Sequence, residues 1–176
     1  MDTTPAILLR KTRFSDTSLI ITWCTERHGK LKTIAKGARR SKSVFSGKLD
    51  LFFTTEIQFI RSQKSELHLL KEVILKETQE EIRKDYKRLQ LASYFVELID
   101  LVTEPDHALP ELFDLLQRAL NYLNRTPPTK RALLHFESEL ARLTGILDTE
   151  TAPFTTLERA HGRLPSLRSE LIGQLN

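Results

Sequence analysis

The chain has few of the residues that build disulfides, metal centres or flexible phosphate loops. Its 176 residues include one cysteine, Cys24, together with six glycines and five histidines. A single cysteine excludes an intramolecular disulfide and a cysteine-rich zinc site. No apolar run approaches the roughly 20 residues of a membrane-spanning helix, and the N-terminus lacks the pattern of a secretory signal. We therefore expect a cytoplasmic protein that holds no metal or cofactor and contacts no membrane.

Catalytic motifs are absent as well. Gly37 and Gly47 stand ten positions apart, too far for a phosphate-binding loop, and Leu49 occupies the place where such a loop has Ser or Thr. No two histidines have the i, i+4 spacing of a metal-binding helix, and no G-x-S-x-G sequence offers a nucleophilic serine. The sequence therefore predicts a protein that is not an enzyme.

Acidic residues are missing from one long segment. Between Gly29 and Leu49 there is no Asp or Glu, although seven cations lie there. Residues 1–64 contain thirteen of the 27 Lys and Arg but only five of the 23 Asp and Glu, so the remainder of the chain is mildly acidic. An uncompensated basic segment is typical of a surface that binds a polyanion, and nucleic acid is the obvious candidate. The seven candidate DNA-binding cations are Lys30, Lys32, Lys36, Arg39, Arg40, Lys42 and Lys48.

Two aromatic residues accompany these cations. Phe14 directly follows Arg13, and Phe45 lies inside the basic segment. Aromatic rings beside phosphate-binding cations are typical sites for stacking on unpaired bases. The sequence leaves an alternative open, in which each ring turns inward and anchors its own loop. We include Arg13 and Phe45 among the expected DNA-binding residues.

The first 75 residues have the alternating pattern of β-strands. Five strands are expected, at residues 6–13, 17–25, 30–36, 51–60 and 67–75. In the third strand, Leu31, Thr33 and Ala35 alternate with outward-facing lysines, so several cations share one face. Five strands with short turns and one long basic connection fit a small barrel of the OB type. An SH3-like barrel or an open meander would have the same pattern.

From Gln79 onward, apolar residues recur every three or four positions, which is the period of a helix. Helices are expected at 79–103, 110–125 and 130–144, followed by a loose connection and a short helix at 166–175 with Ser166 as N-cap. The expected fold class is therefore α+β. A five-stranded OB-fold β-barrel that binds nucleic acid occupies residues 1–78, and an α-helical domain with three main helices and a C-terminal segment occupies residues 79–176.

Ordered motifs along the chain give a further indication. Four lie in the barrel part and three in the helical part: Asp16-Thr17-Ser18-Leu19-Ile20, Thr25-Glu26-Arg27-His28-Gly29-Lys30, Ala35-Lys36-Gly37-Ala38-Arg39-Arg40-Ser41-Lys42-Ser43, Phe45-Ser46-Gly47-Lys48-Leu49, Tyr94-Phe95-Val96-Glu97-Leu98, Pro110-Glu111-Leu112-Phe113-Asp114-Leu115-Leu116 and Phe136-Glu137-x-Glu139-Leu140-x-Arg142-Leu143-x-Gly145. In these motifs the chain resembles the bacterial recombination mediator family RecO, over about residues 6–147.

The resemblance implies an OB-fold domain followed by a helical domain, without enzymatic activity. RecO proteins bind single- and double-stranded DNA, anneal complementary strands, and act with RecR and single-strand-binding protein in recombinational repair. The implied step is loading of the recombinase onto coated DNA. Many members carry a cysteine zinc ribbon just after the position of Leu147, where this chain has no cysteine. The resemblance therefore implies a short, zinc-free member.

The expected mechanism is neutralisation of DNA phosphates by the basic segment, which would let two strands approach while their bases stay free to pair. Contacts to the phosphate backbone carry no sequence information, so sequence preference should be weak. One alternative is an adaptor that does not handle DNA and whose basic face docks an acidic partner tail, such as that of single-strand-binding protein. Another is an RNA-binding OB protein of translation, which fits the charge but not the helical part.

Overall fold

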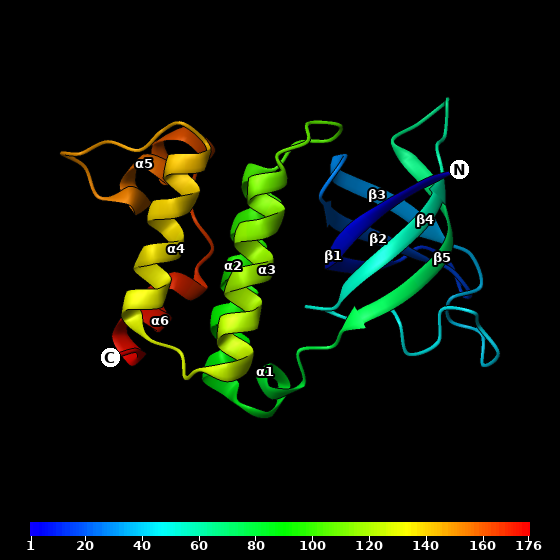
Figure 1. The fold of residues 1–176 in the computed structure, drawn as a ribbon, viewed down its shortest axis with the longest axis horizontal. Coiled ribbons are helices and arrows are strands. Elements are labelled where there is room, and N and C mark those ends of the chain that lie inside the picture. Colours follow the sequence, from blue (N-terminus) through cyan, green and yellow to red (C-terminus); the bar gives the residue numbers. More distant parts are fainter. The chain divides into compact units, whose positions relative to one another are not determined.

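Five strands close into a barrel in the N-terminal part of the chain (Figure 1). The computed structural model describes residues 1–176. Its strands are β1 (Asp2–Arg13), β2 (Leu19–Thr25), β3 (Gly29–Ala35), β4 (Thr54–Ile60) and β5 (Leu67–Glu77). They follow the order β1-β2-β3-β5-β4 around the barrel, and β3 and β5 form the parallel pair. The closed order confirms the predicted OB-fold barrel and excludes an open meander.

The register of the strands places two loops at the same end of the barrel. Arg13 of β1 lies opposite Leu19 of β2, and Leu19 lies opposite Ala35 of β3. The loop 14–18 between β1 and β2 therefore begins beside the loop 36–53 between β3 and β4. We call these two loops, together with Arg13, the basic end of the barrel.

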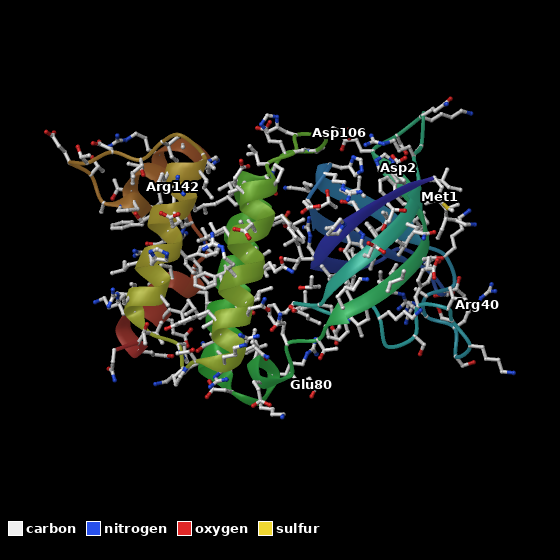
Figure 2. The ribbon with its side chains drawn as sticks, viewed as in Figure 1. Met1, Asp2, Arg40, Glu80, Asp106 and Arg142 are labelled. Atoms are coloured by element: carbon white, nitrogen blue, oxygen red, sulfur yellow. The ribbon has the colours of Figure 1, made fainter.

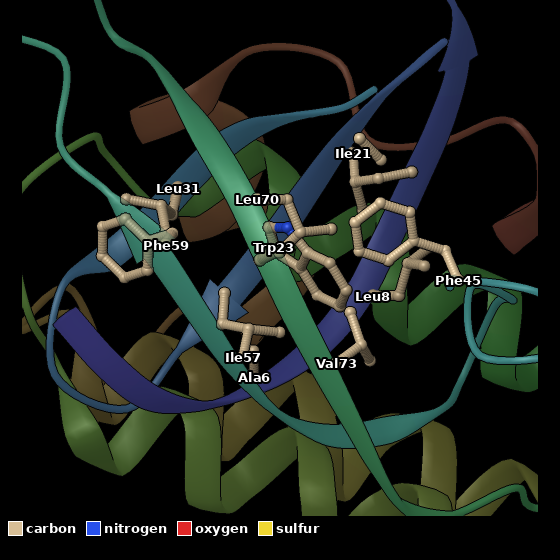
Figure 3. Close-up of a cluster of buried hydrophobic side chains, with 11 residues drawn as sticks. Ala6, Leu8, Ile21, Trp23, Leu31, Phe45, Ile57, Phe59, Leu70 and Val73 are labelled. Carbon is tan, nitrogen blue, oxygen red and sulfur yellow. The ribbon is translucent and has the colours of Figure 1, made fainter. Parts of the chain in front are cut away.

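Apolar side chains from all five strands form the barrel core (Figure 3). Trp23 is fully buried among them, and its indole Nε1–H donates a hydrogen bond of 2.9 Å to Oγ1 of Thr33. This bond satisfies a donor that would otherwise be costly to bury. On β3, Leu31, Thr33 and Ala35 are buried, whereas Lys30 and Lys32 are half-buried. The predicted alternation of β3 is confirmed.

The fourth strand begins later than expected. Residues 51–53, predicted as strand, belong to a turn in which the Phe53 N–H donates to the Asp50 carbonyl at 3.4 Å. Phe52 adopts the left-handed conformation with φ 69°. The turn buries both Phe52 and Phe53. Two consecutive apolar residues can share one side of the chain in such a turn, which period-2 reasoning does not anticipate.

Six helices follow the barrel: α1 (Glu80–Lys84), α2 (Tyr86–Val102), α3 (Pro110–Arg125), α4 (Lys130–Leu143), α5 (Pro153–His161) and α6 (Leu167–Gln174). The expected single helix at 79–103 is wrong, because Asp85 is extended, with φ −128° and ψ 120°. Its carboxylate accepts a hydrogen bond of 2.9 Å from the Arg88 backbone N–H, so Asp85 caps the start of α2. The helices predicted at 110–125 and 130–144 match α3 and α4 closely.

The C-terminal part holds two helices where the sequence indicated a loose connection and one short helix. Helix α5, which was missed, begins at Pro153, a residue well suited to the first turn because its absent N–H needs no partner there. Helix α6 matches the predicted short helix, although the Ser166 side chain makes no capping hydrogen bond. None of the helices combines the length and hydropathy needed to cross a membrane.

The chain divides into two compact units, Met1–Thr78 with Thr103–Phe113, and Gln79–Val102 with Asp114–Asn176. The segment Thr103–Phe113 therefore groups with the barrel, whereas the sequence placed it in the helical part. It reaches the barrel at β3, where the Lys30 N–H donates to the Glu104 carbonyl at 3.2 Å. That residues 1–78 and 79–176 form separate domains stays a prediction.

A buried ion pair holds the C-terminal helix in the second unit. Glu137 of α4 is 1 % exposed and accepts two hydrogen bonds from the Arg168 guanidinium of α6, at 2.6 and 3.0 Å. The Tyr94 hydroxyl of α2 donates a third, at 2.6 Å. Burial and the neighbouring carboxylate raise the pKa of Tyr94, so its hydroxyl keeps the proton that it donates.

Candidate nucleic-acid interface

The loop 36–53 carries most of the predicted cations and is built from successive tight turns. Backbone N–H groups donate to the carbonyl three residues earlier at several points along it, as from Arg40 to Gly37 at 3.0 Å and from Lys48 to Phe45 at 3.0 Å. Gly37 and Gly47 have positive φ values of 70° and 72°, which glycine adopts without strain. The segment is therefore long but internally hydrogen-bonded, so its cations start from a defined backbone.

Phe45 anchors this loop to the barrel. Its ring is 5 % exposed and belongs to the core cluster that also contains Leu8, Ile21 and Val73 (Figure 3). The expectation that Phe45 stacks on a base is therefore wrong for this structure, and the anchoring alternative holds. A second attachment lies at the far end of the loop, where the Lys11 ammonium pairs with the Asp50 carboxylate at 2.9 Å.

Arg39 joins the two loops of the basic end. Its guanidinium donates to the carbonyls of Ser15 and Asp16, at 3.3 and 3.0 Å, and its backbone N–H donates to the Thr17 carbonyl at 3.0 Å. Arg13 also has a local partner, because its guanidinium pairs with the Asp16 carboxylate at 2.6 Å. Both arginines thus hold the architecture of the basic end in addition to contributing charge.

Three predicted cations at the basic end are exposed and have neither an ion pair nor a side-chain hydrogen bond. They are Lys36, Arg40 and Lys42. Lys48 also forms no ion pair and is half-buried. In Figure 2, Arg40 extends from its loop into solvent, well away from Asp2 and Asp106. Because these side chains have no competing anion, a phosphate would meet positive charge that is not already neutralised.

Lys30 and Lys32 do not lie at the basic end. Lys30 pairs in register with Cys24 near the other end of β2, and six residues separate it from Lys36. At roughly 3.3 Å per residue, that separation is about 20 Å along the strand. The two lysines border a small hollow whose lining includes Glu66 and Asp106. The predicted cations therefore form a cluster at the basic end and a separate pair near acidic groups.

A charge cluster that the sequence did not indicate occupies the end of the barrel opposite the basic end. Arg61 contacts the carboxylates of Asp2 and Asp106, at 2.8 and 3.2 Å, and its guanidinium lies 2.7 Å from Nδ1 of His28. The hydrogen bond from Arg61 lowers the pKa of Asp2. Burial, with the nearby Arg61 charge as a second cause, lowers the pKa values of His28 and His68. The Arg61 guanidinium is thus shared by two carboxylates and is not available to a phosphate, in contrast with the unpaired cations of the basic end.

The helical unit contains a cavity of about 550 Å³. Its lining includes Phe95 of α2 and Phe136 of α4, a stacked pair with ring centroids 4.0 Å apart. Its lining also includes Arg118 and Arg131, of which Arg118 pairs with Asp114 at 2.7 Å. Arg131 is exposed and forms no ion pair. The cavity thus combines apolar walls with an available cation, a feature that helical periodicity alone does not reveal.

Comparison with known proteins gives matches over both units. Residues 1–79 match the family model described as "Recombination protein O N terminal", and residues 83–147 match "Recombination protein O C terminal". The curated relatives include proteins named "DNA repair protein RecO" from Rhodopirellula baltica, Syntrophus aciditrophicus and Desulfatibacillum aliphaticivorans.

The chain is 35 % identical to the Rhodopirellula protein over 140 residues, which are 80 % of this chain and 52 % of the relative. It is 34 % identical to the Syntrophus protein over 142 residues, 81 % of this chain and 55 % of the relative. It is 38 % identical to the Desulfatibacillum protein over 123 residues, which are 69 % of this chain and 48 % of the relative. The chain spans about half the length of the curated relatives it matches.

Proposed function

The chain belongs to the recombination protein O (RecO) family, and on that premise we propose that its basic end binds DNA phosphates and brings complementary strands together for annealing. Family membership supports a role in DNA repair by recombination. The DNA-binding surface, the annealing activity and the partners of this chain are what we propose beyond that role. It involves no covalent chemistry, and the protein acts as a recombination mediator rather than as an enzyme.

The observation that carries the proposal is the set of unpaired cations at the basic end. Lys36, Arg40 and Lys42 project from a loop that Phe45 fixes to the barrel core. Binding a phosphate there breaks no existing ion pair, and the anchored backbone limits the conformational entropy lost. Single- and double-stranded DNA share the same phosphate chemistry, so this surface binds both and reads little sequence.

Annealing follows from charge neutralisation. Two strands repel each other through their phosphates, and cations that contact only the backbone reduce this repulsion while leaving the base edges free to pair. OB barrels bind oligonucleotides through the face formed by strands β2 and β3 and the loops beside it. The loop 14–18, braced by Arg39, is one of these loops in this chain.

The proposed partners are RecR and single-strand-binding protein. RecR comes from family membership alone. The cavity of the helical unit supports the second partner, because apolar walls beside Arg131 complement an acidic peptide that also carries apolar residues. We therefore place the acidic tail of single-strand-binding protein in this cavity and the DNA at the basic end.

A second candidate function, favoured by the same unpaired cations, is an adaptor whose basic end docks an acidic partner tail instead of DNA. A fluorescent oligonucleotide and an acidic peptide would then compete for one surface. Displacement of bound oligonucleotide by a modest excess of peptide supports the adaptor. Simultaneous binding of both ligands supports separate sites for DNA and peptide.

The test of annealing is the rate at which two complementary labelled oligonucleotides pair in the presence of the protein. The variant Arg40→Ala/Lys42→Ala removes two unpaired cations from the basic end. The matched control, Lys64→Ala/Lys130→Ala, removes two exposed lysines from elsewhere, so the change in net charge is the same. We expect annealing to slow in the first variant and not in the control. Equal slowing in both, or in neither, would refute the proposed surface.

A further inference from the structure

Phe14 is the exposed phenylalanine of this chain. Phe14 is 57 % exposed, whereas Phe45, the aromatic residue that lies between the cations of the loop 36–53, is 5 % exposed. The other seven phenylalanines are buried or half-buried. A large ring held in water is informative when it lies beside a functional surface. Phe14 does so, because it opens the loop 14–18 of the basic end.

The backbone beneath Phe14 is fixed by hydrogen bonds. The N–H groups of Phe14 and Ser15 both donate to the Ser18 carbonyl, at 3.1 and 3.2 Å, and the Ser18 N–H returns a bond of 3.1 Å to Oγ of Ser15. Arg39 braces the same turn from the neighbouring loop. The ring is therefore presented on a rigid platform, and only its side-chain rotation remains to be fixed when a ligand binds.

From these observations we propose that the Phe14 ring stacks on an unpaired base of the bound DNA and gives the basic end a preference for single strands over intact duplex. This inference rests on the proposed function, because the cations must first hold the phosphates. Arg13 directly precedes Phe14 in the chain, and Arg39 contacts the loop of Phe14 through the Asp16 carbonyl. A strand whose phosphates these arginines hold therefore has bases within reach of the Phe14 ring. In an intact duplex the base faces are already stacked on their neighbours. The ring has no partner there.

Val44 provides a matched control. It is 70 % exposed on the loop 36–53, so it is also an apolar side chain of the basic end. Val44 lacks an aromatic face, so Val44→Ala tests whether any exposed apolar side chain of the basic end gives the preference for single strands. Phe14→Tyr keeps the ring, whereas Phe14→Leu keeps apolar bulk without it.

The experiment measures the affinity of the full chain for a labelled single-stranded oligonucleotide and for a duplex whose two ends are closed by non-nucleotide linkers, so that neither a loop base nor a frayed base is available. Stacking on one base predicts that Phe14→Ala weakens single-strand binding by at least about fivefold. The affinity for the duplex should be unchanged, and so should the salt dependence of binding to either DNA. Phe14→Tyr and Val44→Ala should keep the wild-type preference, and Phe14→Leu should lose it.

Two failures are distinguishable. If the wild type binds DNA with a normal salt dependence and Phe14→Ala changes neither ligand, or both equally, the stacking inference is wrong and the proposed function stands. If the wild type binds neither DNA, the proposed function falls and the inference falls with it. Association with vesicles of anionic phospholipid that depends on Phe14, without any single-strand preference, would also overturn the inference. Because Phe14 is exposed, we expect the thermal midpoints of its variants to match the wild type.

Discussion

Replacing Phe45 by alanine should destabilise the barrel, because the structure makes this ring part of the core. Large aromatic-to-alanine changes in protein cores cost about 3–5 kcal/mol, from lost burial and from the cavity that remains. Phe45 enters the core from a loop and keeps 5 % of its surface exposed, so water and loop movement can partly fill the space. We therefore expect the free energy of unfolding of the barrel to fall by about 3 kcal/mol, near the lower limit of that range.

Urea unfolding, followed by the fluorescence of the single tryptophan, Trp23, measures this loss directly, since Trp23 lies in the same cluster. With a slope of about 1–3 kcal/mol per molar urea, the midpoint should fall by roughly 1–3 M. Phe14→Ala is the control, and its midpoint should shift by no more than the equivalent of about 0.5 kcal/mol. An unchanged midpoint for Phe45→Ala, combined with a selective loss of single-strand binding, would show that Phe45 faces DNA and that the anchoring argument is wrong.

Two further predictions concern stability. Arg168→Ala leaves the buried Glu137 carboxylate with one hydrogen bond, from Tyr94, and should lower the free energy of unfolding of the helical unit by about 3–5 kcal/mol. Arg142→Ala, which breaks the solvent-exposed pair with Glu139, should lower it far less, and similar losses in both variants would contradict this account of the buried pair. Burial lowers the pKa values of His28 and His68 below the ordinary 6.5, so the folded barrel binds fewer protons than the unfolded chain. The stability of the barrel should therefore be fully present above about pH 6.5 and decline as the pH falls below that value. His28→Asn/His68→Asn should flatten this decline in urea midpoints measured across pH 5–8, and an unchanged decline would assign it to other groups.

Local patterns predicted the elements whose burial follows a simple period. Leu31, Thr33 and Ala35 face the core because the strand period places them together, and α3 has the predicted bounds because Pro110 starts it. The break at Asp85 was missed because an apolar stripe continues across it, although Asp is a frequent N-cap and gave a usable signal. Helix α5 was missed because its scattered Thr residues and flanking Pro and Gly resemble a loop.

The candidate site was predictable in charge but not in arrangement. Phe14 and Phe45 are indistinguishable in sequence, each an aromatic residue among cations, and only the folded core decides that Phe45 points inward. The separation of Lys30 from the basic end could have been foreseen, since six residues of strand extend about 20 Å. The Arg61 cluster could not, because it joins Asp2, His28 and Asp106 from distant parts of the chain.

The most direct test of the central claim, that DNA binds at the basic end, is the salt dependence of binding to a labelled single-stranded oligonucleotide by fluorescence anisotropy. Four to six phosphate contacts predict a slope of log K against log salt of roughly −3 to −4. Arg40→Ala/Lys42→Ala should reduce the steepness by about 1.4, while Lys64→Ala/Lys130→Ala leaves it unchanged. A slope that is the same in all three proteins, or no binding at low salt, would contradict the account.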